Sequence, residues 1–313
     1  MNQPILCVKN LSKTYDDTVA VRNVSFNVYP GEIFGLIGPS ESGKSSIIDM
    51  ICGTVYPTCG DIEINGKSIV DDFENAVKYI GGSLENSNVY TNMTGLQNLK
   101  YYAGLYPSIT NIKERINSLA HFLELEEDMK KLVKDYTSDK LQKLVIAQAL
   151  LHFPKLLILD EPTKNLEKDS ILNIRNFLKK IIKKYNIAVL IGSKNLSEMK
   201  QLCDTVAIIS GGEILDIKTS EEFEKSIQLG QKIAFRVNYP NFGAKMIKDK
   251  LNLNPHAIGS EIILKVSEDE ISSISEFLAK YNIVVFGVRK ITKTFEDIYI
   301  SILNKKLKKS QLK

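Results

Sequence analysis

The chain has 313 residues, a formal net charge of +4 and 43% hydrophobic residues, which is typical of a globular protein with one full domain and a smaller second one. It contains no apolar run of about 18 residues, so we expect no membrane-spanning helix. Four cysteines without a C-x-x-C pair, and only three histidines, argue against a metal centre or a disulfide framework. The N-terminus lacks a signal-peptide pattern, and reduced cysteines in the cytosol are the plain interpretation.

A glycine-rich segment between a predicted strand and a predicted helix dominates the first part of the chain. Short strands are predicted at 5–8 and 24–28, and a Pro-Gly turn then leads into an apolar strand over 31–37. Residues 38–45 follow with the pattern G-x-x-x-x-G-K-S, and a helix is predicted directly after them. This context indicates a phosphate-binding P-loop, because such a loop works only where its amides converge at a helix N-terminus. An ordinary Gly/Ser turn is the alternative.

Several residues of this loop have a physical role toward a phosphate. Gly38 and Gly43 allow a close backbone approach that a Cβ would block. Lys44 can reach the terminal phosphates, and the Ser45 hydroxyl can take a coordination place on Mg²⁺. Glu41 stands where most such loops carry Gly; we expect it to point outward, although its charge could weaken binding. The residues predicted to bind phosphate are Gly38, Pro39, Ser40, Glu41, Ser42, Gly43, Lys44, Ser45 and Ser46.

The middle of the chain ends in a second diagnostic stretch. Two strands are predicted before it, over 60–64 and 78–82, and an Asn-Gly turn ends the first of them. Helices are predicted at about 95–105, 112–125 and 140–152. Apolar residues 156–159 then end in Asp160 and Glu161, which is typical of a buried central strand with carboxylates at its C-terminal edge. Asp160 would hold Mg²⁺, usually through water, and Glu161 would polarise the attacking water. The alternative is a strand that happens to end in two acids.

The rest of the chain predicts a separate, smaller domain. A helix over 169–184 and strands over 188–193, 205–209 and 213–215 come first, with a hairpin turn predicted at Gly211 and Gly212 between the last two strands. Residues 221–225 indicate a polar connector. A strand is then predicted over 232–237, a helix over 244–251, a hairpin of strands over 256–258 and 261–266, a helix over 267–280 with Ser267 as N-cap and Glu270 as its capping-box partner, and a strand over 283–288. This strand–helix–strand–strand–helix–strand order favours a small ferredoxin-like α+β domain. We therefore expect a nucleotide-binding domain over 1–220 with a helical subdomain at about 85–152, a linker over 221–230, a second domain over 231–304 and a basic tail over 305–313. The tail is expected to be solvated, with contact to anionic lipid as the alternative.

The order of these motifs resembles one family of nucleotide-binding proteins. Over residues 5–220, the P-loop and the strand ending in Asp160 and Glu161 make the chain similar to the nucleotide-binding subunit of an ATP-binding-cassette (ABC) transporter. The C-terminal part resembles the domain appended to bacterial single-cassette export subunits, with residues 294–297 matching a helix start. Residues 80–86 and 90–94 are most similar to bacitracin- and lantibiotic-type exporters. The resemblance implies an α/β P-loop cassette, with a mixed sheet and a helical subdomain, followed by the ferredoxin-like domain.

The resemblance also implies ligands and partners. The expected cofactors are ATP and Mg²⁺. The expected partners are membrane-spanning transporter subunits and a second cassette, with no nucleic acid. The expected location is cytoplasmic, peripheral at the inner face of the cell membrane. Tyr15 matches the aromatic residue that stacks on adenine, with a buried core tyrosine as the alternative. Glu85 stands at the Q-loop position, usually Gln, where a carboxylate can still bind Mg²⁺ or its water. Glu161, Lys44 and Lys194 would be the catalytic residues.

Two departures from the family pattern affect the expected phosphate contacts. In the family, a Ser- and Gly-rich signature before a helix clamps the γ-phosphate of the opposite subunit, and the aligned residues here are Thr137, Ser138 and Asp139. Thr137 can replace the serine, whereas Asp139 stands where Gly is expected. The repulsion between the Asp139 carboxylate and a phosphate about 4 Å away is on the order of 4 kcal/mol per charge pair at an effective dielectric near 20. Lys140 is expected to offset part of this repulsion. Lys194 occupies the H-switch position, where the family has His, and an ammonium cannot arrange water as a neutral imidazole does.

The departures leave two hypotheses open. Lys194 would impair the nucleotide site built on this chain's own motifs, and Asp139 would impair the site that this chain completes in a partner. A homodimer would therefore carry both defects in each of its two sites. A heterodimer with a consensus cassette would carry one main defect in each site. Glu167 also replaces the D-loop aspartate. The first hypothesis is a slowed ATPase that energises export, and the second is an ATP-binding regulatory or structural subunit with little turnover. Cassette proteins acting on ribosomes or DNA usually carry paired cassettes or coiled-coil insertions, and the sequence shows neither.

Overall fold

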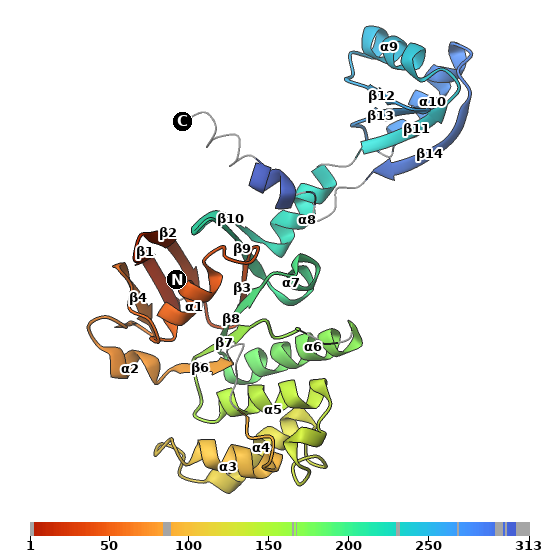
Figure 1. Cartoon of the computed structure of the whole chain (residues 1–313). Coiled ribbons are helices and arrows are strands. Elements are labelled where there is room, and N and C mark those ends of the chain that lie inside the picture. Colours follow the sequence, from red (N-terminus) through yellow and green to blue (C-terminus); the bar gives the residue numbers. More distant parts are fainter. Residues whose placement is uncertain are drawn as a thin grey trace. The chain divides into compact units, whose positions relative to one another are not determined.

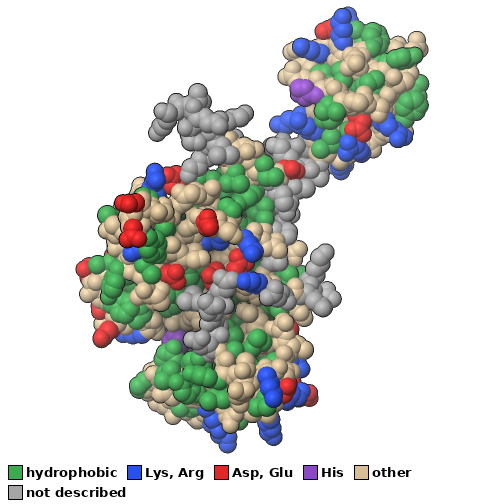
Figure 2. Space-filling model, viewed as in Figure 1, with side chains coloured by type: hydrophobic (Ala, Val, Ile, Leu, Met, Phe, Trp, Pro, Cys, Tyr) green, Lys and Arg blue, Asp and Glu red, His purple; other side chains and the backbone are tan. Residues whose placement is uncertain are grey.

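The computed structural model describes residues 3–83, 89–164, 166, 168–229, 232–267, 269–291, 297 and 299–304. The chain divides into two compact units, Met1–Ser220 and Glu221–Lys313 (Figure 1). Each unit has its own hydrophobic core. Figure 2 shows acidic and basic side chains interspersed over the visible face of the first unit, with no large field of one sign. Among the described residues, no helix has the length and apolar composition needed to cross a membrane.

A six-stranded sheet forms the centre of the first unit. Its order is β10-β9-β3-β8-β7-β6, with β3 (Ile33–Ile37), β6 (Ile80–Ser83), β7 (Leu156–Asp160), β8 (Ala188–Ser193), β9 (Thr205–Ser210) and β10 (Glu213–Thr219). Neighbouring strands are parallel except β9 and β10. Strands β3 and β8 are buried over their whole length, as expected for parallel strands covered on both faces. Because the carboxyl ends of parallel strands meet at one edge, the loops after β3, β7 and β8 come together there.

A second, antiparallel sheet packs beside the strand that leads into the glycine-rich loop. Its order is β2-β1-β4-β5, with β1 (Leu6–Tyr15), β2 (Thr18–Val28), β4 (Cys59–Ile64) and β5 (Lys67–Ser68). The predicted Asn-Gly turn is confirmed, because Asn65 and Gly66 join β4 to β5 with φ of 50° and 75°. Phe26 of β2 stacks on Phe34 of β3 with ring centroids 5.1 Å apart. The two sheets therefore share one core, which also includes the apolar face of α1 (Lys44–Ile51).

Helices complete the first unit. They are α2 (Phe73–Val77), α3 (Gly95–Ala103), α4 (Ile112–Leu123), α5 (Ser138–Leu150), α6 (Lys168–Tyr185) and α7 (Leu196–Leu202), with the short 3-10 helix η1 (Val133–Asp135). Helix α5 begins at Ser138, two residues before the predicted start, because the Thr137 hydroxyl caps it by accepting from the Lys140 amide at 3.4 Å. Residues 151–155 connect the end of α5 to β7, so the N-terminus of this 13-residue helix lies about 20 Å from that connection.

The second unit has the predicted ferredoxin-like order. Its elements are α8 (Ser220–Leu229), β11 (Lys232–Val237), α9 (Pro240–Leu251), β12 (His256–Ile258), β13 (Glu261–Leu264), α10 (Glu270–Lys280) and β14 (Val285–Ile291). The four strands form an antiparallel sheet in the order β12-β13-β11-β14. Alternate residues of β11 and β13 pack against α9 and α10, and the buried core residues are Ile233, Phe235, Val237, Ile247, Ile262, Leu264, Ile274, Leu278 and Ile283.

Three local predictions for this part of the chain differ from the structure. Residues 221–225, predicted as a polar connector, lie within α8. Helix α10 begins at Glu270 and not directly after Ser267, the predicted N-cap, although the Glu270 carboxylate accepts from the Ser267 amide and hydroxyl at 2.8 and 2.9 Å. Helix α9 begins four residues early, because Pro240 suits its first turn. The helix start predicted at 294–297 falls mostly outside the described residues, as does the basic tail over 305–313.

Candidate nucleotide-binding site

The loop between β3 and α1 has no room for side chains at its two key glycines. A Cβ on Gly38 would lie 2.3 Å from the Ile209 carbonyl oxygen. Gly43 is the N-cap of α1 with φ of 99°, and a Cβ there would lie 2.5 Å from the Ala20 carbonyl oxygen. Since both contacts are to backbone, neither can be relieved by a side-chain shift. The loop is thus closed tightly around the N-terminus of α1, where amides converge.

The same loop is fixed from outside by the turn between β9 and β10. The Gly212 amide donates to the Ser42 carbonyl oxygen at 3.0 Å, and the Gly212 carbonyl accepts from the Arg22 amide at 2.8 Å. A Cβ on Gly212 would lie 2.7 Å from the Ala20 carbonyl oxygen. The Gly-Gly pair at 211–212 was predicted only as a hairpin turn, and its contact with the loop was missed because it joins segments far apart in sequence.

Lys44 is folded into its own loop. Its Nζ donates to the carbonyl oxygens of Gly38 and Pro39 at 2.7 and 2.8 Å and to Ser42 Oγ at 3.3 Å. The residue is only 7% exposed, and burial lowers the pKa of its ammonium, while the charges of Glu161 and Asp160 oppose that shift. A phosphate entering the loop would offer this ammonium anionic acceptors in place of neutral carbonyls.

A cavity of about 620 Å³ opens over the loop. It is lined by Tyr15, Thr18, Val19, Ala20, Ser40, Glu41, Ser42, Gly43, Lys44, Ser45, Ser46, Asp160, Glu161, Lys164, Lys194, Gly211 and Gly212. It brings together most of the residues predicted from the P-loop, the acidic strand end and the switch position. Gly38, Pro39, Thr137, Ser138 and Asp139 do not line it, and Glu85 falls outside the described residues. Its size suits a small-molecule ligand.

Tyr15 lies at the rim of this cavity and is 41% exposed, so it is not a core tyrosine. The Lys13 ammonium lies 4.9 Å from the centroid of its ring. A planar base could therefore stack on the tyrosine without displacing core residues. Thr18, Val19 and Ala20, from the start of β2, form the adjacent wall, and nothing in the sequence pattern pointed to them.

Glu161 is held in place by the end of the neighbouring strand β8. Its amide donates to the Gly192 carbonyl oxygen at 2.8 Å, and it adopts a left-handed backbone with φ of 48°. Its carboxylate accepts from Ser193 Oγ at 3.1 Å and from the Lys194 amide at 3.0 Å. Ser193 is 1% exposed and also accepts from the Asn195 amide at 3.0 Å. The carboxylate is therefore oriented by two donors; the role of Ser193 was not predicted, because it depends on pairing between distant strands.

The oxygen donors along the cavity suit Mg²⁺. Ser45 and Asp160 line the same cavity, and a Cβ on Gly192 would lie 2.7 Å from Asp160 Oδ1, so the glycine leaves room for that carboxylate. Within the described residues there is no group of three His, Cys, Asp or Glu that could hold a metal by itself. This sparse donor set fits Mg²⁺, which is usually bound by one or two protein oxygens together with substrate phosphates and water.

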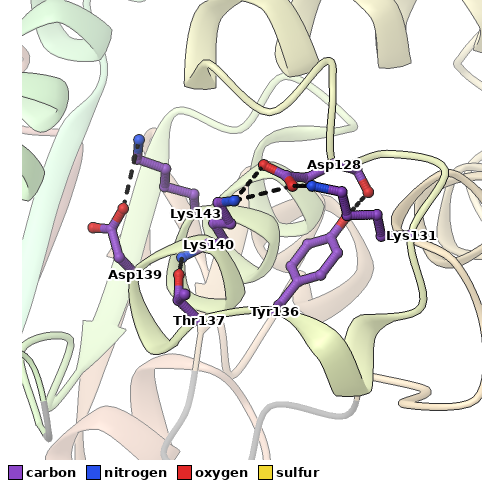
Figure 3. A network of polar contacts seen from close by, with 7 residues as sticks. All are labelled: Asp128, Lys131, Tyr136, Thr137, Asp139, Lys140 and Lys143. Carbon is purple, nitrogen blue, oxygen red and sulfur yellow. Dashed lines mark hydrogen bonds and ion pairs between the residues drawn. The ribbon is translucent and has the colours of Figure 1, made fainter.

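The N-terminus of α5 carries two separate ion-pair groups (Figure 3). Lys140 Nζ lies 2.9 Å from Asp128 Oδ2, and Lys131 pairs with the same carboxylate at 2.6 Å. Hydrogen bonding from Lys131, and then from Lys140, keeps the pKa of Asp128 below its usual value despite burial. Asp139 points the other way, with Oδ2 3.7 Å from Lys143 Nζ. The cation beside Asp139 is therefore Lys143, whereas Lys140, which was expected to offset part of the repulsion between Asp139 and a phosphate, is paired with Asp128.

Replacing Lys44 by Ala should abolish nucleotide binding. The substitution removes the only ammonium inside the described part of the loop, and α1 should remain folded because its hydrogen bonds do not depend on that side chain. Binding of a fluorescent ATP analogue, with circular dichroism as the folding control, measures this. Unchanged binding would remove the phosphate assignment of residues 38–46.

Replacing Glu41 by Gly should stabilise the protein. Glu41 has φ of 63°, and a left-handed conformation costs a residue with a Cβ about 1–2 kcal/mol. The greater freedom of Gly in the unfolded chain offsets part of the gain, so the free energy of unfolding should rise by about 1 kcal/mol. Denaturant unfolding tests this. Glu41→Ala is the matched control, because it removes the same charge but keeps the Cβ. If Glu41→Gly and Glu41→Ala raise the free energy of unfolding equally, the stabilisation comes from loss of the charge and not from the backbone conformation.

Comparisons with known proteins agree with this geometry. Residues 21–164 match the family model described as ABC transporter. The uncharacterized ABC transporter ATP-binding protein YhcH of Bacillus subtilis is 33% identical over 298 residues, covering 95% of each chain. The bacitracin transport ATP-binding protein BcrA of Bacillus licheniformis is 28% identical over 96% of this chain and 97% of its own length. A solved structure described as the ATP binding subunit of an ABC transporter is 26% identical, with a TM-score of 0.63 over 72% of this chain and 94% of its own. The chain belongs to the ABC transporter ATP-binding proteins.

Proposed function

We propose that this chain binds Mg-ATP, pairs with a second cassette, hydrolyses the nucleotide slowly and passes the closing motion to separate membrane subunits that export a substrate. The observation that carries the proposal is the single cavity that collects Lys44, Ser45, Asp160 and Glu161. These residues supply the groups that phosphoryl transfer needs: a cation for the terminal phosphates, oxygen ligands for Mg²⁺ and a base for the water.

Each group has a distinct part in this proposal. The α1 N-terminus and Lys44 bind the phosphates, and Ser45 and Asp160 hold Mg²⁺, which when bound neutralises charge on the phosphate oxygens. Glu161 accepts a proton from the attacking water, and the donors Ser193 and the Lys194 amide keep its carboxylate oriented for that role. Tyr15 binds the adenine by stacking, which adds affinity for any purine.

The slow rate follows from two side chains. Lys194 lines the cavity where the family has His, and its ammonium can contact a phosphate but offers no acceptor to a water. Asp139 places a carboxylate in the first turn of α5, where the family clamps the γ-phosphate of the opposite subunit. The second candidate function, an ATP-binding regulatory subunit with little turnover, is favoured by the same two residues. The oriented Glu161 favours the first.

The export role rests on the full-length relatives. The bacitracin transport protein of Bacillus licheniformis aligns over 96% of this chain, so the alignment includes most of the second unit as well as the cassette. No described helix crosses a membrane, which is consistent with membrane subunits on separate chains. In this proposal the protein lies at the inner face of the cell membrane and has no nucleic-acid partner.

The purified protein should bind Mg-ATP and hydrolyse it slowly. Glu161→Gln should lower the remaining rate by about 100-fold, because a general base typically contributes that much or more. Phosphate release and analogue binding, measured on both proteins, check this. Fast wild-type turnover would contradict the impairment, and equal rates for wild type and Glu161→Gln would favour the regulatory subunit.

The double substitution Asp139→Gly and Lys194→His should raise hydrolysis about tenfold, which corresponds to about 1.4 kcal/mol of the barrier. It removes the carboxylate from the proposed phosphate contact and restores an imidazole that can accept from water. The rate should be measured in the presence of the native partners. No gain there would mean that these two positions do not limit turnover.

A further inference from the structure

We propose that the first unit has a second ligand site, which binds a small planar aromatic anion at the edge of the central sheet opposite the nucleotide cavity. A cavity of about 420 Å³ opens there, between the start of α4, the end of α6 and the segment before β7. This volume is within the range of small-molecule sites. Phe153 and Tyr185 line it three residues before β7 and β8 begin, and among the described residues it shares none with the nucleotide cavity.

Arg115 places a buried positive charge in the wall of this cavity. The residue is 7% exposed; its Nε donates to the Leu151 carbonyl oxygen at 3.0 Å, and its Nη2 donates to the Leu150 carbonyl oxygen. Both carbonyls belong to the end of α5, so the guanidinium also caps that helix. These acceptors are neutral, and burial lowers the pKa of Arg115, with no carboxylate of the described chain opposing that shift. An anionic ligand would supply the counter-charge that this guanidinium lacks.

The guanidinium has donors left for such a ligand. It carries five N–H groups, of which two are directed at the α5 carbonyls, and a further hydrogen bond joins it to the Tyr185 side chain. Because Arg115 lines the cavity, the remaining N–H groups can pair with a carboxylate, whose two oxygens suit the planar fork of an arginine.

The acidic residue at this cavity does not neutralise Arg115. The Glu114 carboxylate accepts from Asn111 Nδ2 at 2.8 Å, and the Asn111 side chain accepts from the Glu114 amide at 3.2 Å, which holds both residues at the start of α4. Lys184 adds a second cation to the lining, and its ammonium lies 5.2 Å from the centroid of the Tyr185 ring. The described lining therefore has two cations and one acid that is bonded elsewhere, which favours an anion.

The exposed ring of Phe153 supplies the preference for a planar ligand. The Arg115 guanidinium carbon lies 3.6 Å from the ring centroid, yet the residue is 57% exposed. Its φ is 58°, a conformation that is rare for a bulky side chain and costs about 1–2 kcal/mol. A smaller cavity of about 200 Å³ shares Arg115, Phe153 and Tyr185 with the first. Strained residues cluster at ligand sites, and a ring kept at the mouth of two cavities can stack on a planar ligand.

The test is isothermal titration calorimetry of the full chain with 2-naphthoate, a planar aromatic carboxylate, in the absence of nucleotide. We expect it to bind with one molecule per chain. The neutral 2-naphthamide and the non-aromatic cyclohexanecarboxylate should each bind at least about tenfold more weakly, because the first lacks the charge for Arg115 and the second lacks the ring for Phe153.

Three variants locate the binding. Phe153→Asn removes the ring but keeps a residue that tolerates the left-handed conformation, and it should weaken 2-naphthoate binding about tenfold. Lys184→Gln should weaken binding about threefold, whereas Lys183→Gln, the matched control beside it and outside the cavity, should have no effect. Arg115→Lys keeps the charge but loses the planar fork, so binding should weaken about 30-fold. If circular dichroism shows that Arg115→Lys is unfolded, the other two variants decide.

The proposal is overturned if 2-naphthoate does not bind, if it binds no better than its two analogues, or if Phe153→Asn and Lys184→Gln bind it as wild type does. Lys44→Ala should bind 2-naphthoate unchanged, and loss of binding there would place the probe in the nucleotide cavity instead. Binding of the fluorescent ATP analogue is measured separately, so failure of this second site leaves the proposed function standing.

Discussion

The register between β7 and β8 is the constraint on which the rest of the site depends. Asp160 lies opposite Gly192, so the residue after Asp160 meets the end of β8, where Ser193 and the Lys194 amide donate to Glu161. A slip of one residue would turn these side chains to the other face of the sheet. The two strands are buried and apolar, which resists such a slip, and the hydrophobic core therefore sets the direction of the Glu161 carboxylate.

The sequence was sufficient for the features that are local in the chain. The P-loop pattern, the acids after an apolar run, and the ferredoxin-like order of the second unit each depend on neighbouring residues, and the observed elements follow them. The predictions missed Ser193, the Gly211–Gly212 contact with the loop and the Lys140–Asp128 pair, because each joins segments that only the fold brings together. Residues 221–225 were misjudged because their polar face suits a surface helix as well as a connector.

The region around the N-terminus of α5 shows how a substitution can have a local structural role. Lys140 stands within the aligned signature, yet its ammonium joins Lys131 on the carboxylate of Asp128, and the Tyr136 hydroxyl donates to the Asp128 carbonyl oxygen at 2.7 Å. Asp128 is thus a common anchor for the residues on both sides of Thr137. This arrangement holds the chain on both sides of the Thr137 cap and leaves Asp139, in the first turn of α5, to Lys143.

The contacts of Lys44 have a consequence for the resting protein. Because its ammonium already has three acceptors within its own loop, departure of a ligand does not leave a buried charge without a counterpart. The loop thus supplies its own acceptors for this ammonium, and its shape does not depend on a bound phosphate. When a triphosphate binds, the Lys44 ammonium exchanges carbonyl acceptors for phosphate acceptors. The gain in binding free energy is the difference between these two interactions, which is smaller than the full attraction between ammonium and phosphate. A smaller gain favours exchange of the ligand over its permanent retention.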